Sequence, residues 1–277
     1  MPMLKRPDGE IYYEEFGEGF PILLFAPGGL RSRLEMWHHP ASGPQRTWCD
    51  WTDVLASKYR VVAMDQRNAG RSKTAIKADH GWHTYAADHL ALMDHLGHQK
   101  FHVLGGCIGG SFCLKFAQVA PDRVTSAVLQ NPIGLHPDHP EYFPDSHIAW
   151  SAEQRAERPE LDKEAIRGFG QNMWGGDFVF CVDREFVRNC PVPTMLLPGT
   201  DIPHPAATSD ELARLLPGVE IVYQWRGPEF MEEQRKRVTA FLDRLMHHSH
   251  IIQLRGNSYR LHESSANPRT KKGTAPK

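Results

Sequence analysis

The chain has 277 residues, which is enough to bury one large core and needs no second full domain. Lysine and arginine number 32 against 33 aspartate and glutamate, so no global charge points to nucleic acid or a membrane surface as a partner. Every apolar run is shorter than a membrane span requires, and the first residues lack the apolar stretch of a signal peptide.

The cysteines are odd in number and irregularly spaced, which suits free thiols in a reducing compartment better than a disulfide framework. They are Cys49, Cys107, Cys113, Cys181 and Cys190. Together with the absence of an evident targeting segment, this pattern predicts a cytoplasmic protein.

The first half of the chain alternates short apolar runs with segments of helical spacing. Apolar runs at residues 21–26, 60–64, 101–106 and 126–130 have the composition of strands buried on both faces, and helical spacing follows at residues 51–58, 85–97 and 111–120. This alternation predicts an α/β fold with a doubly wound, mostly parallel sheet.

The most informative stretch is residues 101–110, whose centre is Gly105-x-Cys107-x-Gly109. A strand, a tight turn and a helix follow one another here, and glycines on both sides of Cys107 avoid side-chain collisions in such a turn. A thiol at the apex lies at a helix N-terminus, which favours the thiolate, and the N–H of Ile108 is placed to bind an oxyanion. A buried structural cysteine in a glycine-rich turn is the alternative interpretation.

This stretch resembles the nucleophile elbow of the α/β-hydrolase superfamily, with cysteine where most members carry serine. Dienelactone hydrolases are relatives that share the cysteine. The loop at residues 65–72, Asp-Gln-Arg-Asn-Ala-Gly-Arg-Ser, resembles another family motif whose role is mainly structural. The resemblance implies a hydrolase core over residues 1–133 and 191–245, and a second oxyanion-hole donor from the backbone of Gly29 or Leu30.

Residues 134–190 interrupt the alternation and are rich in His, Pro, Trp and Phe. An insertion of this size at this point resembles the lid of the family, so we expect its aromatic side chains to line an apolar or aromatic substrate site, although some must form the lid's own core. The resemblance also makes Asp201, just past the predicted strand at residues 193–198, the acid of a catalytic triad.

The catalytic histidine is missing from the expected place. The family carries it after the last strand, where this chain has Glu229 and Phe230, and the imidazole nearest in sequence to Asp201 is His204. The order Cys107, Asp201, His204 agrees with the family. Whether His204 reaches Cys107 cannot be read from the sequence, and a thiol depends less on a base than a hydroxyl does.

The last segment, residues 246–277, is basic and predicted to be a poorly ordered tail. Residues 242–262 resemble the C-terminal end of the ATP-binding helper proteins of insertion-sequence transposases, but no phosphate-binding Gly-x-x-x-x-Gly-Lys-Ser/Thr motif occurs in the chain. A fused tail and a native basic tail both remain open. A metal site at His247, His248 and His250 is the weaker alternative.

Two functions therefore remain. The first is a hydrolase or acyl transferase that acts on a small ester, lactone or related compound through Cys107, with no cofactor and no metal. The second is a catalytically silent ligand-binding protein that keeps the fold and has lost the proton-transfer machinery. In both cases the partner is a small molecule, without nucleic acid or membrane, and the oligomeric state is left open.

Overall fold

The computed structural model describes residues 2–39 and 46–246. One nine-stranded sheet forms the centre of this part, in the order β1-β2-β4-β3-β6-β7-β8-β9, with β5 paired to β2. The strands β1, β2 and β5 pair antiparallel with their neighbours, whereas β4, β3, β6, β7, β8 and β9 run parallel to one another. This confirms the predicted mostly parallel sheet. The strands are β1 (Met3–Arg6), β2 (Gly9–Phe16), β3 (Phe20–Phe25), β4 (Tyr59–Met64), β5 (Lys73–Thr74), β6 (Phe101–Gly106), β7 (Val124–Gln130), β8 (Thr194–Leu197) and β9 (Glu220–Ile221).

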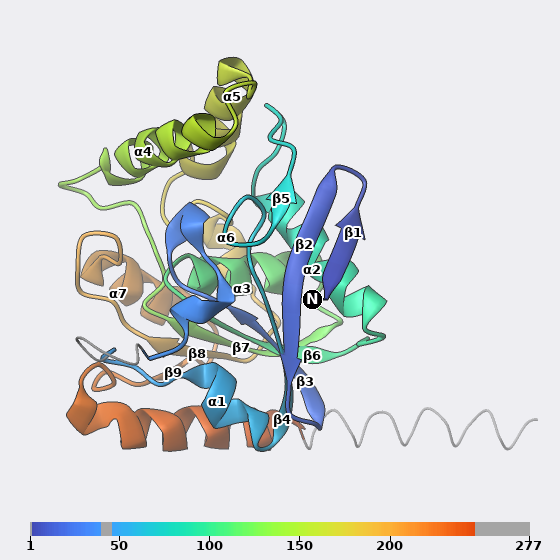
Figure 1. Cartoon of the computed structure of the whole chain (residues 1–277). Coiled ribbons are helices and arrows are strands. Elements are labelled where there is room, and N and C mark those ends of the chain that lie inside the picture. Colours follow the sequence, from blue (N-terminus) through green and yellow to red (C-terminus); the bar gives the residue numbers. More distant parts are fainter. Residues whose placement is uncertain (1, 40–45, 247–277) are drawn as a thin grey trace, which may run out of the picture.

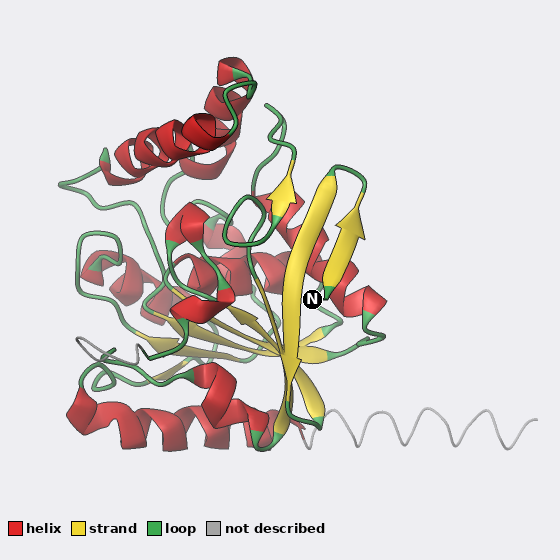
Figure 2. Ribbon diagram, in the orientation of Figure 1, coloured by secondary structure: helices red, strands yellow, loops and turns green. Residues whose placement is uncertain are grey.

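Helices cover both faces of the sheet, as the red and yellow elements of Figure 2 show. The helices are α1 (Trp51–Ala56), α2 (Trp82–His95), α3 (Ile108–Val119), α4 (Tyr142–Glu157), α5 (Lys163–Trp174), α6 (Arg184–Arg188) and α7 (Ala206–Leu215). Three short 3-10 turns are η1 (Gly29–Arg31), η2 (Leu34–Met36) and η3 (Pro228–Phe230), and residues 231–246 are also helical. Figure 1 shows α2 and α3 on one side of the sheet and α1 with the helix at residues 231–246 on the other.

The two faces of the central strands fill two separate hydrophobic cores. In β3, Leu23 and Phe25 pack with α2 and α3, whereas Ile22 and Leu24 pack with α1 and the helix at residues 231–246. Successive side chains of a strand point to opposite faces, so a continuous apolar run is what a sheet covered on both sides requires. This explains why the buried strands have no polar alternation.

Several predicted boundaries shift by a few residues. The strand expected at residues 220–224 ends at Ile221, because the chain leaves the sheet after the hydrogen bond from Val222 N–H to Leu196 O. The helix expected from residue 85 begins at Trp82, where the Thr84 hydroxyl accepts a hydrogen bond from the N–H of Gly81. Such end effects are governed by single caps and are hard to predict.

The loop at residues 65–72 has the structural role that its motif predicts. Arg67 is buried and pairs with Asp88 on α2 at 2.6 Å and with Asp8 at 3.0 Å. Asp65 accepts hydrogen bonds from the Arg71 guanidinium at 2.8 Å and from the N–H of Leu34 at 3.0 Å. Buried charges need such partners, and these fix the loop against the edge of the sheet.

The segment at residues 134–190 forms α4, α5 and α6, and Figure 1 shows α4 and α5 standing apart from the sheet layers. Many of its aromatic rings are used in packing: Phe143 stacks on Trp174 with ring centroids 4.8 Å apart, and Trp174 meets Trp82 of α2 edge-on at 6.0 Å. The rings of Tyr142 and the side chain of Ile148 stay exposed. Few of these aromatic side chains therefore remain available to line a substrate site in the way that the sequence led us to expect.

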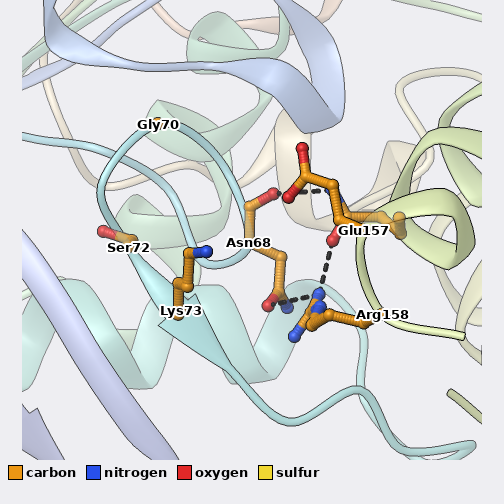
Figure 3. A pocket seen from close by; sticks show the side chains of 7 residues that line it. Asn68, Gly70, Ser72, Lys73, Glu157 and Arg158 are labelled. Carbon is orange, nitrogen blue, oxygen red and sulfur yellow. Dashed lines mark hydrogen bonds between the residues drawn. The ribbon is translucent and has the colours of Figure 1, made fainter. Parts of the chain in front are cut away.

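The far end of α4 is fastened to the loop at residues 65–74. Arg158 donates to the carbonyl of Thr74 at 3.0 Å and to Asn68 Oδ1 at 3.1 Å, and Gln154 donates to the carbonyl of Asn68 at 3.2 Å. Figure 3 shows the small polar pocket between these side chains. Its lining does not include Cys107, so this hollow is a junction between α4 and the core and is separate from the candidate chemistry.

Candidate active site

The chain reverses at Cys107 in the way that the glycine pattern predicts. Cys107 joins β6 to α3 with φ 58° and ψ −122°, a strained backbone conformation for a residue with a side chain. A Cβ on Gly105 would lie 2.1 Å from the carbonyl oxygen of Gly109, and one on Gly109 would lie 2.2 Å from that of Phe25. Only glycine fits at these two positions, and the thiol is thereby presented, partly exposed, at the start of α3.

The loop after β8 brings His204 and Asp201 together. The N–H of His204 donates to the carbonyl of Asp201 at 3.0 Å, and Nδ1 of the His204 ring hydrogen-bonds to Oδ1 of Asp201. Gly199 makes room for this fold-back, since a Cβ there would lie 2.4 Å from the Cβ of His204. The other carboxylate oxygen, Oδ2, accepts from the Arg226 guanidinium at 3.0 Å.

The second ring nitrogen of His204 is buried, and the His204 ring lies within electrostatic range of Cys107. Nε2 is buried and makes no hydrogen bond of regular geometry within the described ranges, yet the charges of His204 and Cys107 shift the pKa of each other. His204 and Cys107 therefore interact through their charges, an effect that does not require a well-aligned hydrogen bond.

These interactions favour a thiolate and an imidazolium. Burial opposes the charge on Cys107, but the His204 cation and the N–H groups of Gly28 and Ile108 together hold the pKa of the thiol below its usual value. Burial likewise opposes the charge on His204, and Cys107 and Asp201 overcome it and raise its pKa to about 9. The hydrogen bond from His204, helped by Arg226, lowers the pKa of Asp201 despite partial burial.

Two backbone N–H groups help to lower the pKa of the Cys107 thiol. They belong to Ile108, a candidate donor from the sequence, and to Gly28. Gly28 has φ 119°, a conformation that favours glycine, and it precedes η1, which contains the expected donors Gly29 and Leu30. Gly28 was missed because the glycine pair marks the loop without showing which N–H turns toward the thiol.

Comparison with known proteins places this geometry in a family. A family model described as "alpha/beta hydrolase fold" matches residues 21–167. The chain belongs to the alpha/beta hydrolase family. The elbow at Cys107 and the loop at residues 65–72 lie within the matched residues. A second model, described as "IstB-like ATP binding protein", matches residues 223–267. Within that range Val238, Phe241 and Leu242 are buried in the hydrolase core, and residues 247–267 lie outside the described part of the chain.

Curated relatives match parts of this chain. A protein of Azorhizobium caulinodans named as a carbamate hydrolase is 31% identical over 131 residues, 47% of this chain and 44% of the relative. The 2-hydroxy-6-oxo-6-phenylhexa-2,4-dienoate hydrolase of Comamonas testosteroni is 27% identical over 129 residues, 47% and 42% of the two chains. The matches thus span less than half of these relatives' length.

Among solved structures, an enol-lactonase from Burkholderia xenovorans LB400 superposes with a TM-score of 0.62 and 21% sequence identity. The superposition covers 87% of this chain and 100% of the lactonase chain. At that identity the likeness concerns the fold alone.

The other four cysteines of this chain have environments that suppress reactivity. Burial raises the pKa of Cys49 to about 11 and that of Cys181 to about 12, and it also raises the pKa values of Cys113 and Cys190. Cys107 differs because a cation and two N–H groups outweigh its burial. Among the five cysteines, Cys107 is therefore the one whose pKa is lowered, which favours its thiolate.

The loop in which the resemblance places the catalytic histidine carries other side chains in this chain. Glu229 and Phe230 lie in η3, and the side chain that this loop sends to Asp201 is Arg226. Sequence reasoning missed Arg226, since nothing in the run Trp-Arg-Gly-Pro marks it for a role. Tyr142 at the start of α4, one of the aromatic residues expected from the sequence to line the substrate site, has its pKa raised by burial and by the negative charges of Cys107 and Asp201.

No group of three or more His, Cys, Asp or Glu side chains in residues 2–39 and 46–246 is arranged to hold a metal ion. The cluster His247, His248 and His250 and the tail at residues 247–277 lie outside the described residues; Met246, assigned to the tail from sequence, is helical and packs against the core. Within the described ranges, no helix combines the length and apolar character needed to cross a bilayer.

Proposed function

We propose that this alpha/beta hydrolase cleaves a small ester, lactone or related acyl compound through a cysteine nucleophile. Cys107 is the nucleophile, His204 the acid and base, Asp201 the residue that orients His204, and the N–H groups of Gly28 and Ile108 the oxyanion hole. The observation that carries the proposal is the position of the His204 ring, hydrogen-bonded to Asp201 at Nδ1 and electrostatically coupled to Cys107 on its other side.

The first half of the reaction forms a thioester. The Cys107 thiolate attacks the acyl carbon, and the carbonyl oxygen becomes an oxyanion that accepts hydrogen bonds from Gly28 and Ile108. When the bond to the leaving oxygen breaks, the His204 imidazolium gives its proton to that oxygen. An alcohol leaves, or the open end of a lactone remains attached to the acyl group.

The second half regenerates the thiolate. Neutral His204 takes a proton from a water molecule as the water oxygen attacks the thioester, and the C–S bond breaks to release the carboxylic acid. The imidazolium is then restored beside the thiolate. Throughout, Asp201 keeps Nδ1 of His204 as the donor, so that Nε2 is the nitrogen that exchanges protons with Cys107, leaving group and water.

The substrate class is supported by two considerations. The relative named as a carbamate hydrolase acts, by its name, on the carbonyl group of a carbamate. The segment at residues 134–190, which we propose as the lid, brings Tyr142 into the electrostatic range of Cys107 and Asp201. A small substrate held under α4 is therefore expected to meet a phenol hydroxyl close to the reacting atoms.

The alternative, a silent ligand-binding protein, drew its support from the empty histidine position at residues 229–230. His204 supplies an imidazole from the loop of Asp201 itself, which favours catalysis over the alternative. The hydrolase and the ligand-binding protein differ in one measurable property: only the hydrolase turns over a substrate in a reaction that needs the Cys107 thiol.

The test is hydrolysis of a panel of short-chain aryl esters and lactones by the full chain. Cys107→Ala should abolish turnover, and His204→Ala should lower kcat by a factor of roughly 10² to 10⁴, the usual range for a general base. His83→Ala, an exposed histidine on α2, is the matched control and should retain parental kcat. Equal turnover in Cys107→Ala and the parent would refute the proposal, and no turnover by any variant together with substrate binding would support the silent protein.

A further inference from the structure

Arg226 occupies an unusual position relative to the candidate site. It follows β9, the edge strand next to β8, and its Nη1 lies 3.0 Å from Oδ2 of Asp201, the oxygen that His204 does not use. The neighbouring Trp225 is buried and donates from Nε1 to the carbonyl of Pro198 at 2.8 Å, which ties this loop to the end of β8. The Trp225 hydrogen bond thus fixes the backbone from which the Arg226 guanidinium reaches the Asp201 carboxylate.

We infer that Arg226 is a positioning residue that holds the Asp201 carboxylate and balances the charge of the Cys107–His204 pair. This rests on the proposed function, in which the pair does the chemistry. With Arg226, two positive groups (Arg226 and the His204 imidazolium) face two negative groups (Asp201 and the Cys107 thiolate). Without it the cluster carries an unbalanced negative charge.

The groups that influence the pair come from three elements. Asp201 is on the loop after β8, Arg226 follows β9, and Tyr142 lies at the start of α4. Tyr142 is neutral near pH 7, so Arg226 is the cation that faces Asp201 among the described residues, apart from His204 itself. The side chains of Arg226 and Asp201 are 34% and 41% exposed, so solvent weakens but does not remove their effect.

The inference fixes the sign of a measurable effect. Loss of a positive charge disfavours the thiolate and favours the imidazolium, so both pKa values of the pair must rise. Loss of the negative charge of Asp201 must lower both. For a partly exposed charge a few ångströms away, a shift of about half to one pH unit is expected, and high salt should reduce it.

The experiment measures the rate of Cys107 alkylation by iodoacetamide against pH, which reports the thiolate without requiring turnover. Arg226→Gln should move the acidic midpoint up by about half a pH unit or more, and Asp201→Asn should move it down. Arg226→Lys keeps the charge and should stay near the parent. Arg235→Gln is the charge-matched control, since Arg235 is exposed and pairs with Glu232 on the helix at residues 231–246.

The outcomes separate this inference from the proposed function. An unchanged or lowered midpoint in folded Arg226→Gln, with the melting curve of the parent, would overturn the positioning role even if the enzyme is active. A shifted midpoint with no turnover on any substrate would support the role of Arg226 and count against hydrolysis. If Arg226→Gln does not fold, Arg226→Lys provides the test. The inference would also be overturned if the alkylation midpoint of Arg226→Lys rose as far as the midpoint of the parent rises at high salt, where the charge of Arg226 is screened.

Discussion

Gly109→Ala offers a sharp test of how the elbow is built. In an open helical position this change would stabilise the protein by up to about 1 kcal/mol, because alanine is the better helix former. At residue 109 the new Cβ would lie 2.2 Å from the carbonyl oxygen of Phe25 and 2.8 Å from its Cβ, both on β3. Ordinary contacts need about 3.5 Å, so the start of α3 must move by roughly 1 Å.

That movement has two expected costs. Overpacking of this kind costs about 1–3 kcal/mol, which for a domain of this size lowers the melting temperature by about 2–10 °C. The same displacement shifts the N–H of Ile108 and the sulfur of Cys107, and a misplacement of about 1 Å lowers kcat by about 10²-fold. Thermal unfolding and ester hydrolysis measure the two effects separately.

Gly218→Ala is the control for this variant. Gly218 has φ 59° and no neighbour within 4 Å of an added Cβ, so the substitution should cost only about 1 kcal/mol of backbone strain and leave kcat unchanged. A Gly109→Ala protein that melts at or above the parental temperature and hydrolyses esters at the parental rate would refute the account of the elbow.

The remaining predictions concern reactivity, pH and the end of the chain. Brief limiting iodoacetamide treatment, mapped by mass spectrometry, should label Cys107 first; faster labelling of Cys49, whose pKa burial raises to about 11, would contradict this. The pH profile of kcat/KM should fall on the acid side as the Cys107 thiolate is protonated, and on the alkaline side as pH rises through about 9, because the raised pKa of His204 marks loss of the proton that the leaving group needs. A flat profile well above pH 9 would exclude His204 as the acid. Truncation after Met246 should change the melting temperature by no more than about two degrees, since the few apolar side chains beyond it cannot offset the ordering cost of some thirty residues; a large loss would make that segment part of the domain.

Much of the fold could be predicted because its signals are local. The apolar runs of β3, β4, β6 and β7 and the glycines around Cys107 act over a few neighbouring residues, and backbone sterics leave one arrangement for them. The same holds for Ile108, whose N–H position follows from the helix that begins there. The boundaries that shifted, at α2 and β9, depend on single caps and on one edge pairing.

The residue pattern was enough to predict the elbow, the sheet and the order of Cys107, Asp201 and His204 along the chain. It could not show that His204 folds back onto Asp201, that the N–H of Gly28 helps to lower the pKa of Cys107, or that Arg226 reaches the carboxylate from the loop after β9. These contacts join separate loops at one edge of the sheet. Their geometry depends on strand register and on small spaces such as that at Gly199, which no local pattern records.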